Sequence, residues 1–114
     1  MKASETQIKD LAPLILQLWP DNSPAEAEEI AREYVRGKET AAFHKEADGK
    51  VAGLAMCSLR HDYVEGCNTG PVGYLEGIIV DDTFRGRGIA KALCRECEEW
   101  AKGLAAASLP ATAN

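Results

Sequence analysis

One segment constrains the fold of this chain more than any other: an apolar run leads through a glycine-rich turn directly into an amphipathic stretch. The run is Gly73–Val80, with Glu76 as its one charged residue, and it has the character of a buried strand. The turn occupies residues 85–88, and apolar residues then recur at helical spacing from Ile89 to near Gly103. The segment predicts a strand, a turn and a helix in direct succession, in a domain that combines α and β structure.

The glycine-rich turn has the composition of a phosphate cradle. Such a turn presents successive backbone N–H groups, with the positive end of the helix dipole behind them. Gly86 and Gly88 allow close backbone approach, and Arg85 and Arg87 add positive charge. No Walker A motif is present, and Lys91 stands where a dinucleotide motif has its third glycine. On spacing alone, a pyrophosphate site and an ordinary basic loop both remain open.

Two further helices are predicted in the first third of the chain. The first runs from about Thr6 to Leu18, with Pro13 in its early turns. The second follows Ser23, because a serine N-cap, a proline at the first helical position and a glutamate three residues after the cap form a capping box. This helix is expected to end near Gly37.

Two strands and a loop complete the predicted elements. Strand-like runs at Thr40–Glu46 and Val51–Arg60 flank Asp48-Gly49, a dipeptide typical of tight hairpins. A loop that contains glycine and asparagine covers Glu65–Pro71 before the apolar run. We therefore expect a mixed, mostly antiparallel sheet of three or four strands, flanked by three helices.

Length and charge limit the possible partners. A chain of 114 residues with net charge −5 is expected to form one domain, and its acidity argues against nucleic acid or an anionic membrane. A cationic small molecule fits this charge better. Met1–Glu5 lack the apolar stretch of a secretory signal, so we expect a cytoplasmic protein.

The cysteines are interpreted as reduced thiols of the core or of helix surfaces. Cys94 and Cys97 have Cys-x-x-Cys spacing, but no second pair or histidine cluster completes a metal site, so none is expected. The other two are Cys57 and Cys67.

The turn also carries a family resemblance. Arg85-x-x-Gly88-x-Ala90 after an apolar strand resembles motif A of the GCN5-related N-acetyltransferases, whose turn holds the pyrophosphate of acetyl-CoA. Within that family, three separated segments resemble the aminoglycoside 6′-N-acetyltransferases of the chromosomal Gram-negative type, over roughly residues 5–103. These segments are Leu18-Trp19-Pro20, Arg60-His61-Asp62-Tyr63-Val64-Glu65-Gly66 and Leu75-Glu76-Gly77-Ile78-Ile79-Val80. The resemblance implies an acyl-CoA N-acetyltransferase-like α+β fold, an α/β sandwich.

The resemblance also implies a site. Trp19, Tyr63 and Glu76 would line the aminoglycoside pocket, although judged alone the two aromatics are more typical of a core, and Glu76 could point to solvent. Backbone pairing with the pantetheine arm and binding of the pyrophosphate would place acetyl-CoA at Ile78, Ile79, Val80, Arg85, Gly86, Arg87, Gly88, Ile89, Ala90 and Lys91.

The residue types fit acetyl transfer to an amine. Glu76 among apolar neighbours is expected to have a raised pKa, to accept a proton directly or through water, and to attract a protonated amine. Backbone N–H groups near Ile78 to Val80 could polarise the thioester carbonyl. The expected function is therefore transfer of acetyl from acetyl-CoA to the 6′-amine of aminoglycosides. Alternatives are a non-catalytic CoA-binding remnant and an acetyltransferase for another amine; a homodimer is expected by resemblance.

The end of the chain departs from the family. Residues 104–114 carry no charge, and the fifth strand, fourth helix and last two strands of the family have no counterpart. We expect residues 1–103 to be the N-terminal part of the fold, with a short start, and residues 104–114 to be an unrelated, disordered tail. Ser108–Asn114 can be encoded so that a shifted frame reads Glu-Phe-Ala-Ser-Asp-Cys-Glu-Leu, which resembles the fifth strand. This hypothesis of a frame slip is tested by sequencing the gene.

Overall fold

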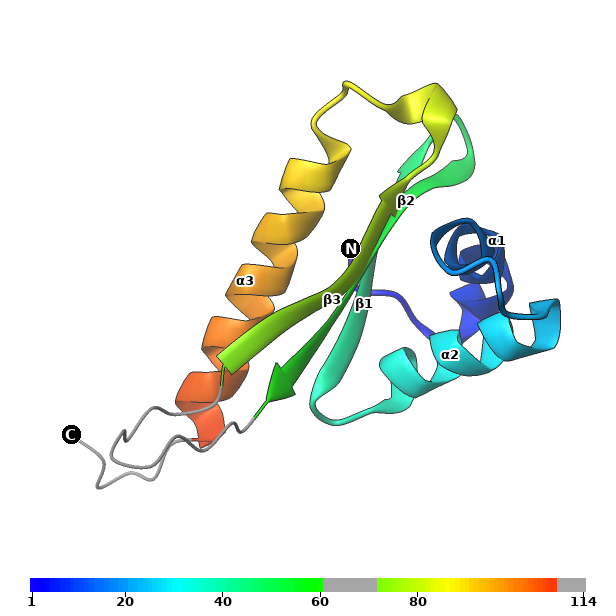
Figure 1. The fold of residues 1–114 in the computed structure, drawn as a ribbon. Coiled ribbons are helices and arrows are strands. Elements are labelled where there is room, and N and C mark those ends of the chain that lie inside the picture. Colours follow the sequence, from blue (N-terminus) through cyan, green and yellow to red (C-terminus); the bar gives the residue numbers. More distant parts are fainter. Residues whose placement is uncertain (61–71, 109–114) are drawn as a thin grey trace.

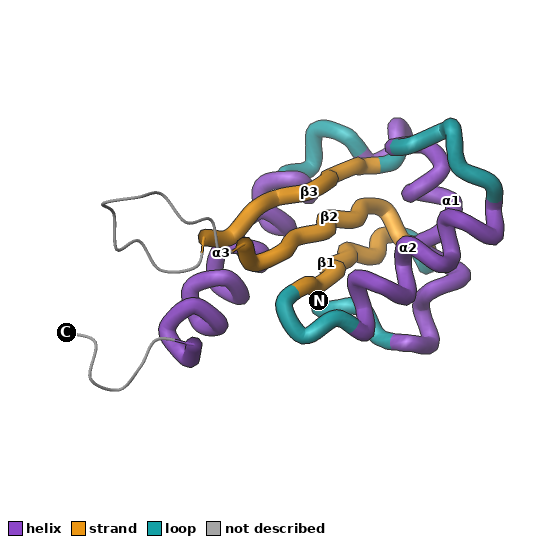
Figure 2. The backbone as a smooth tube through the Cα atoms, turned by 60° about the horizontal axis from the view of Figure 1, so that its bottom comes forward, coloured by secondary structure: helices purple, strands orange, loops and turns teal. Residues whose placement is uncertain are grey.

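Within residues 1–60 and 72–108, which the computed structural model describes, a three-stranded antiparallel sheet lies between two helical layers. Helices α1 and α2 cover one face of the sheet and α3 covers the other (Figure 1). Figure 2 shows the strands side by side in the order β1-β2-β3. The elements are η1 (Glu5–Gln7), α1 (Ile8–Leu18), α2 (Pro24–Arg36), β1 (Thr40–Ala47), β2 (Lys50–Arg60), β3 (Val72–Val80), η2 (Asp82–Phe84) and α3 (Ile89–Ser108). The predicted α+β class, with an antiparallel sheet and flanking helices, is confirmed.

Strand β2 is the centre of the core. Its residues alternate between two buried layers, because successive side chains of a strand point to opposite faces. Leu54 and Met56 pack in the layer formed with α1 and α2, whereas Ala55 and Cys57 pack in the layer formed with α3. Burial on both faces explains the almost continuous apolar sequence of this strand.

The cysteine interpretation is confirmed for the thiols that can be placed. Cys57 and Cys97 are buried in the layer under α3, and Cys94 is half-buried on the same helix. All three are free thiols. Cys67 lies outside the described residues.

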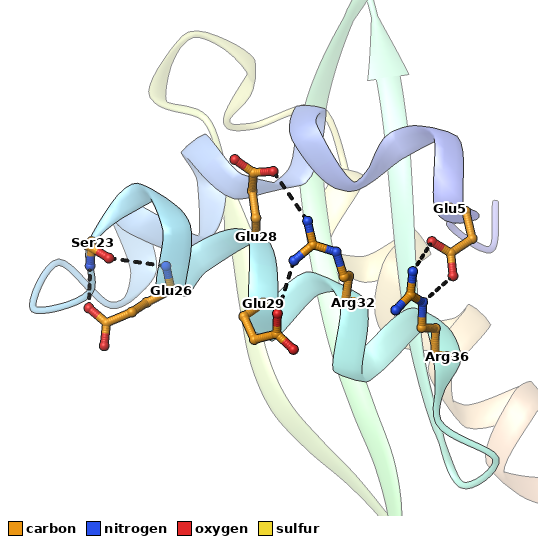
Figure 3. Close-up of polar contacts among 7 residues, drawn as sticks. All are labelled: Glu5, Ser23, Glu26, Glu28, Glu29, Arg32 and Arg36. Atoms are coloured by element: carbon orange, nitrogen blue, oxygen red, sulfur yellow. Dashed lines mark hydrogen bonds and ion pairs between the residues drawn. The ribbon is translucent and has the colours of Figure 1, made fainter.

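The predicted capping box sets the start of α2. Ser23 Oγ accepts from the Glu26 N–H at 3.1 Å, and Glu26 Oε1 accepts from the Ser23 N–H at 2.8 Å (Figure 3). At the other end of α2, Arg36 forms a two-bond ion pair with Glu5 of η1. The ion pair connects α2 to the start of the chain.

One expectation for the end of the chain is corrected. α3 continues past Gly103 to Ser108, so residues 104–108 are helical rather than disordered. Leucine and alanine at 104–107 are strong helix formers, which offset the roughly 1 kcal/mol that one interior glycine costs. At the other end the start is short, as expected, and it contacts the sheet through an isolated bridge, in which the Ala3 N–H donates to the Ala42 carbonyl at 2.7 Å. The division of the chain at residue 103 stays a prediction, and residues 109–114 lie outside the described part.

None of the helices in the described ranges combines the length and apolar character needed to cross a membrane.

A buried histidine lies beneath the N-terminal segment. Ser4 N–H donates to Gln7 Oε1 at 2.9 Å, which leaves the Gln7 amide nitrogen 2.7 Å from Nε2 of His44. An amide nitrogen only donates, so this ring nitrogen accepts and the imidazole is neutral. Burial, followed by the nearby N-terminal ammonium, lowers the pKa of His44.

This burial has a consequence for acid stability. Because the unfolded chain takes up a proton at a histidine near pH 6.5 and folded His44 resists it, the free energy of unfolding should fall as the pH drops below about 6.5. Urea unfolding at pH 7.5 and 5.5 checks this. We expect the native chain to lose up to about 1.4 kcal/mol more than His44→Gln between pH 7.5 and 5.5. Equal losses in the two proteins would contradict the assignment.

Candidate functional site

Glu76 occupies a bulge in β3. The Cα of Met56 is paired with that of Gly77 and the Cα of Cys57 with that of Leu75, so Glu76 is the extra residue. A bulge brings two consecutive side-chain positions to one face of a sheet. Glu76 therefore shares the α1 and α2 face with Gly77, in the middle of an otherwise regular strand.

Gly77 places the predicted Trp19 beside this bulge. A Cβ built on Gly77 would lie 2.6 Å from Leu18 Cδ2 and 3.1 Å from Trp19 Cζ2. The half-buried indole of Trp19 thus rests on the backbone of residue 77, next to the carboxylate residue. The structure brings Trp19 and Glu76 to the same face of the sheet. Tyr63, the third expected pocket residue, lies outside the described residues.

Two neighbours on β2 hold the Glu76 carboxylate. The Ser58 hydroxyl donates to Oε1 at 2.7 Å. The guanidinium of Arg60 donates to Oε1 from Nε at 3.0 Å and from Nη2 at 2.7 Å, and Nη2 also donates to Oε2 at 2.9 Å. The same guanidinium stacks on the ring of Tyr74, 4.4 Å from its centre.

These donors overturn one expectation from the sequence. A raised pKa was expected for Glu76, but the hydrogen bond from Ser58, with those and the charge of Arg60, holds the pKa below its ordinary value against the opposing effect of burial. The side chain is 21% exposed and is ionised at neutral pH. On α2, burial and then the Glu76 charge raise the pKa of Tyr34, so this phenol lies within electrostatic reach of the site. Glu76 is therefore suited to binding a cation rather than to taking a proton.

Ser58, Arg60 and Tyr74 complete the site, although none of the three was predicted to be a site residue. Ser58 and Arg60 are two residues apart on one strand, so they share a face, and Tyr74 is paired with Ser58 across the sheet. The alternation of side chains along β2, which puts Ser58 and Arg60 on one face, can be inferred from the sequence. The bulge that brings Glu76 to this face cannot be inferred in the same way, because it depends on the register between β2 and β3.

β3 has the outer place in the described sheet. Ile78, Ile79 and Val80 are paired with β2 along one side, and their other side faces away from the sheet. Ile78 packs in the layer under α3 and Ile79 in the layer under α1 and α2, so both side chains are fixed, and the outer backbone edge pairs with no other strand of the described residues. An extended ligand could add to this edge as a strand does.

The turn after β3 has the geometry that its glycines predict. Gly86 and Gly88 have φ of 80° and 76°, values that favour glycine. The first bond of the α3 ladder runs from the Ala92 N–H to the Gly88 carbonyl at 3.1 Å, so the amides of Ile89, Ala90 and Lys91 precede it. These amides form the positive end of a 20-residue helix.

Both arginines of the turn are exposed and carry surface contacts. Arg85 pairs with Asp82 at 2.9 Å. Arg87 stacks on buried Phe84 with its guanidinium carbon 5.1 Å from the ring centre, and approaches Asp48 at 3.9 Å. Exposed pairs of this kind contribute little to stability, so either arginine can exchange its partner for a phosphate.

Comparison with known proteins places the chain among acetyltransferases. The profile of the Acetyltransferase (GNAT) family matches residues 8–113. "Aminoglycoside N(6′)-acetyltransferase type 1" of Salmonella enteritidis is 41% identical over 101 residues, which are 85% of this chain and 67% of that protein. The protein of the same name from Salmonella typhimurium is 44% identical over 88 residues, 74% of this chain and 58% of that protein. The chain thus spans about three fifths to two thirds of the length of these curated relatives.

Solved structures of acetyltransferases are also similar to this chain. The structure of AAC(6′)-Iy in complex with the bisubstrate analogue CoA-S-monomethyl-acetylneamine has a TM-score of 0.81 at 36% identity, over 91% of this chain and 71% of that chain. AAC(6′)-Iy in complex with CoA has a TM-score of 0.82 at 36% identity, over 90% of this chain and 68% of that chain. Similarity to a ribosomal-protein-alanine N-acetyltransferase from Brucella melitensis, 22% identical with a TM-score of 0.70 over 90% of this chain and 71% of that chain, supports the fold alone.

The contact between Gly77 and Trp19 can be tested directly. Gly77→Ala should lower the free energy of unfolding by about 1–3 kcal/mol and shift the Trp19 fluorescence, because the added methyl group displaces Leu18 and the indole. Trp100→Phe as background isolates the Trp19 signal. Gly103→Ala is the matched control: its Cβ meets nothing within 4 Å, and the change should stabilise α3 by up to about 1 kcal/mol. An unchanged Trp19 spectrum in Gly77→Ala would contradict the contact.

Proposed function

The chain belongs to the acetyltransferase (GNAT) family, and on that premise we propose that it transfers the acetyl group of acetyl-CoA to the 6′-amine of aminoglycosides. The observation that carries the proposal is an ionised carboxylate, Glu76, on the face that also bears Trp19, next to a strand edge that leads into a glycine-rich helix start. Relatives named for this activity and neighbouring structures with CoA and a bisubstrate analogue support it.

The acetyl-CoA side is assigned to the edge of β3 and the turn. The backbone of Ile78 to Val80 would pair with the pantetheine arm, and the residues from Arg85 to Lys91 would bind the pyrophosphate. Bound there, acetyl-CoA supplies an activated acetyl thioester. A backbone N–H of the β3 edge would donate to the thioester oxygen as negative charge develops on it.

The amine side is assigned to Glu76 and Trp19, with Tyr63 as a further expected wall. The carboxylate binds an ammonium group by charge and hydrogen bond, and the indole gives a flat apolar surface for a sugar ring. Since the pKa of Glu76 is lowered, the carboxylate orients the amine and its hydration, and water carries the proton away. Catalysis then rests chiefly on holding two substrates in position.

Two further expectations, on cellular location and oligomeric state, accompany this function. Free thiols at Cys57, Cys94 and Cys97 support a cytoplasmic location, where thiols stay reduced. A homodimer is proposed from the resemblance alone. Sedimentation across a range of protein concentrations measures the oligomeric state.

The activity is tested by thiol release from acetyl-CoA with kanamycin as acceptor. Glu76→Gln should lower kcat/KM at least about tenfold, because the amine loses a charged hydrogen-bond partner. Glu99→Gln removes the same charge from the exposed surface of α3 and should leave the rate unchanged.

The alternatives give different outcomes in the same assay. Acetyl-CoA binding without thiol release would point to the CoA-binding remnant. Release with a polyamine and none with kanamycin would point to an acetyltransferase for another amine. Equal rates in Glu76→Gln and the native chain would remove Glu76 from the site.

The turn is tested by acetyl-CoA affinity. Lys91→Ala should weaken binding about two- to fivefold, because Lys91 lies in the first turn of α3 where the pyrophosphate is expected. Lys102→Ala removes the same charge near the other end of the helix and should leave the dissociation constant unchanged. Calorimetric titration measures both. Equal losses in the two variants would show a non-specific charge effect and contradict the assignment.

A further inference from the structure

The two oxygens of Glu76 are used unequally. Oε1 accepts three hydrogen bonds, one from Ser58 and two from Arg60, whereas Oε2 accepts one, from Arg60 Nη2. A carboxylate oxygen has two lone pairs, so Oε1 is filled. Among the contacts of the described residues, Oε2 is the oxygen that keeps capacity for a further donor.

Arg60 is itself fixed from a second direction. Its guanidinium lies over the ring of Tyr74, two residues before Glu76 on β3. Stacking on an aromatic face and a fork of N–H donors are properties of arginine that lysine does not share. Arg60 is thus held at its planar face by Tyr74 and at its edge by Glu76.

We propose that Arg60 is a positioning residue, which with Ser58 fills Oε1 of Glu76 and leaves Oε2 as the acceptor for an ammonium group of the substrate. The proposal rests on the proposed function and deepens it, because it names the atom that receives the amine. The site then recognises a cation by a directed hydrogen bond to one oxygen, and the guanidinium compensates much of the carboxylate charge.

The opposite role for Arg60 is competition, in which the guanidinium occupies the place of the substrate's ammonium group. The hydrogen-bond pattern favours positioning, because Arg60 shares Oε1 with Ser58 and a donor can approach Oε2 without displacing either. The two roles differ in sign. Removing a positioning group weakens binding of the substrate, and removing a competitor strengthens it.

The test uses the full chain, kanamycin as probe and Arg60→Gln, with Arg60→Lys as a variant that keeps the charge. Calorimetry measures kanamycin affinity, and NMR titration of the labelled Glu76 carboxyl measures its pKa. We expect Arg60→Gln to weaken kanamycin binding about fivefold and to raise the pKa of Glu76 toward its ordinary value. Arg60→Lys should also weaken binding, since an ammonium group cannot replace the fork.

Arg36→Gln is the matched control. Arg36 forms a two-bond ion pair with Glu5 that, like the Arg60 pair, joins a guanidinium to a carboxylate, but it is more exposed and lies at the end of α2. This variant should change neither kanamycin affinity nor the Glu76 titration. Circular dichroism of each variant confirms that it is folded.

The experiments give different results if Arg60 has no positioning role and if the proposed function is wrong. Unchanged or tighter kanamycin binding in Arg60→Gln would overturn the positioning role while the function stands. An unchanged pKa of Glu76 in this variant would show that the ion pair with Arg60 is not the basis of the positioning role. Absence of kanamycin binding by the native chain would contradict both the proposed function and the role of Oε2 as its amine acceptor.

Discussion

Burial of β2 on both faces is the constraint on which the rest of this structure depends. One layer under α1 and α2 and another under α3 enclose the strand, and Leu54 and Ala55 are fully buried on opposite sides. Neither layer can be left open, because each covers half of the apolar side chains of the same strand. The helices are therefore fixed relative to the sheet, and through the sheet relative to each other.

This arrangement gives β3 two tasks at once. Ile78 and Ile79 contribute to opposite layers of the core, which requires strict alternation. Glu76 must nevertheless reach the face that carries Ser58 and Arg60. The bulge satisfies both demands, because it adds one residue without turning the apolar residues on either side of it to the wrong layer.

Local signals in the sequence predicted the local structure well. The capping box at Ser23 is formed as expected, and the glycine-rich turn lies between a strand and a helix as expected, since both depend on residues close in the chain. The end of α3 was missed because alanine continues a helix without a marked stop. The pairing of Ala3 with Ala42 was missed because it joins distant segments through backbone groups, which carry no side-chain signal.

Some residues of the candidate site were predicted, but their contacts with one another were not. The family resemblance supplied Trp19 and Glu76, and the structure puts them on one face. The protonation state of Glu76 could not be inferred from its apolar neighbours in sequence, because its pKa is set by Ser58 and Arg60 on another strand. Strand register, which decides those contacts, is a property of the whole sheet.

The bulge also says something about how such a site can arise. If residue 76 were removed, the pairs Cys57 with Leu75 and Met56 with Gly77 would follow one another without interruption, and every apolar residue of β3 would keep its layer. In geometric terms Glu76 is an insertion into the antiparallel pairing of β2 with β3, and this pairing is complete without it. A single added codon in an edge strand is thus enough to place a charged group on a packed sheet while the fold beneath it stays the same.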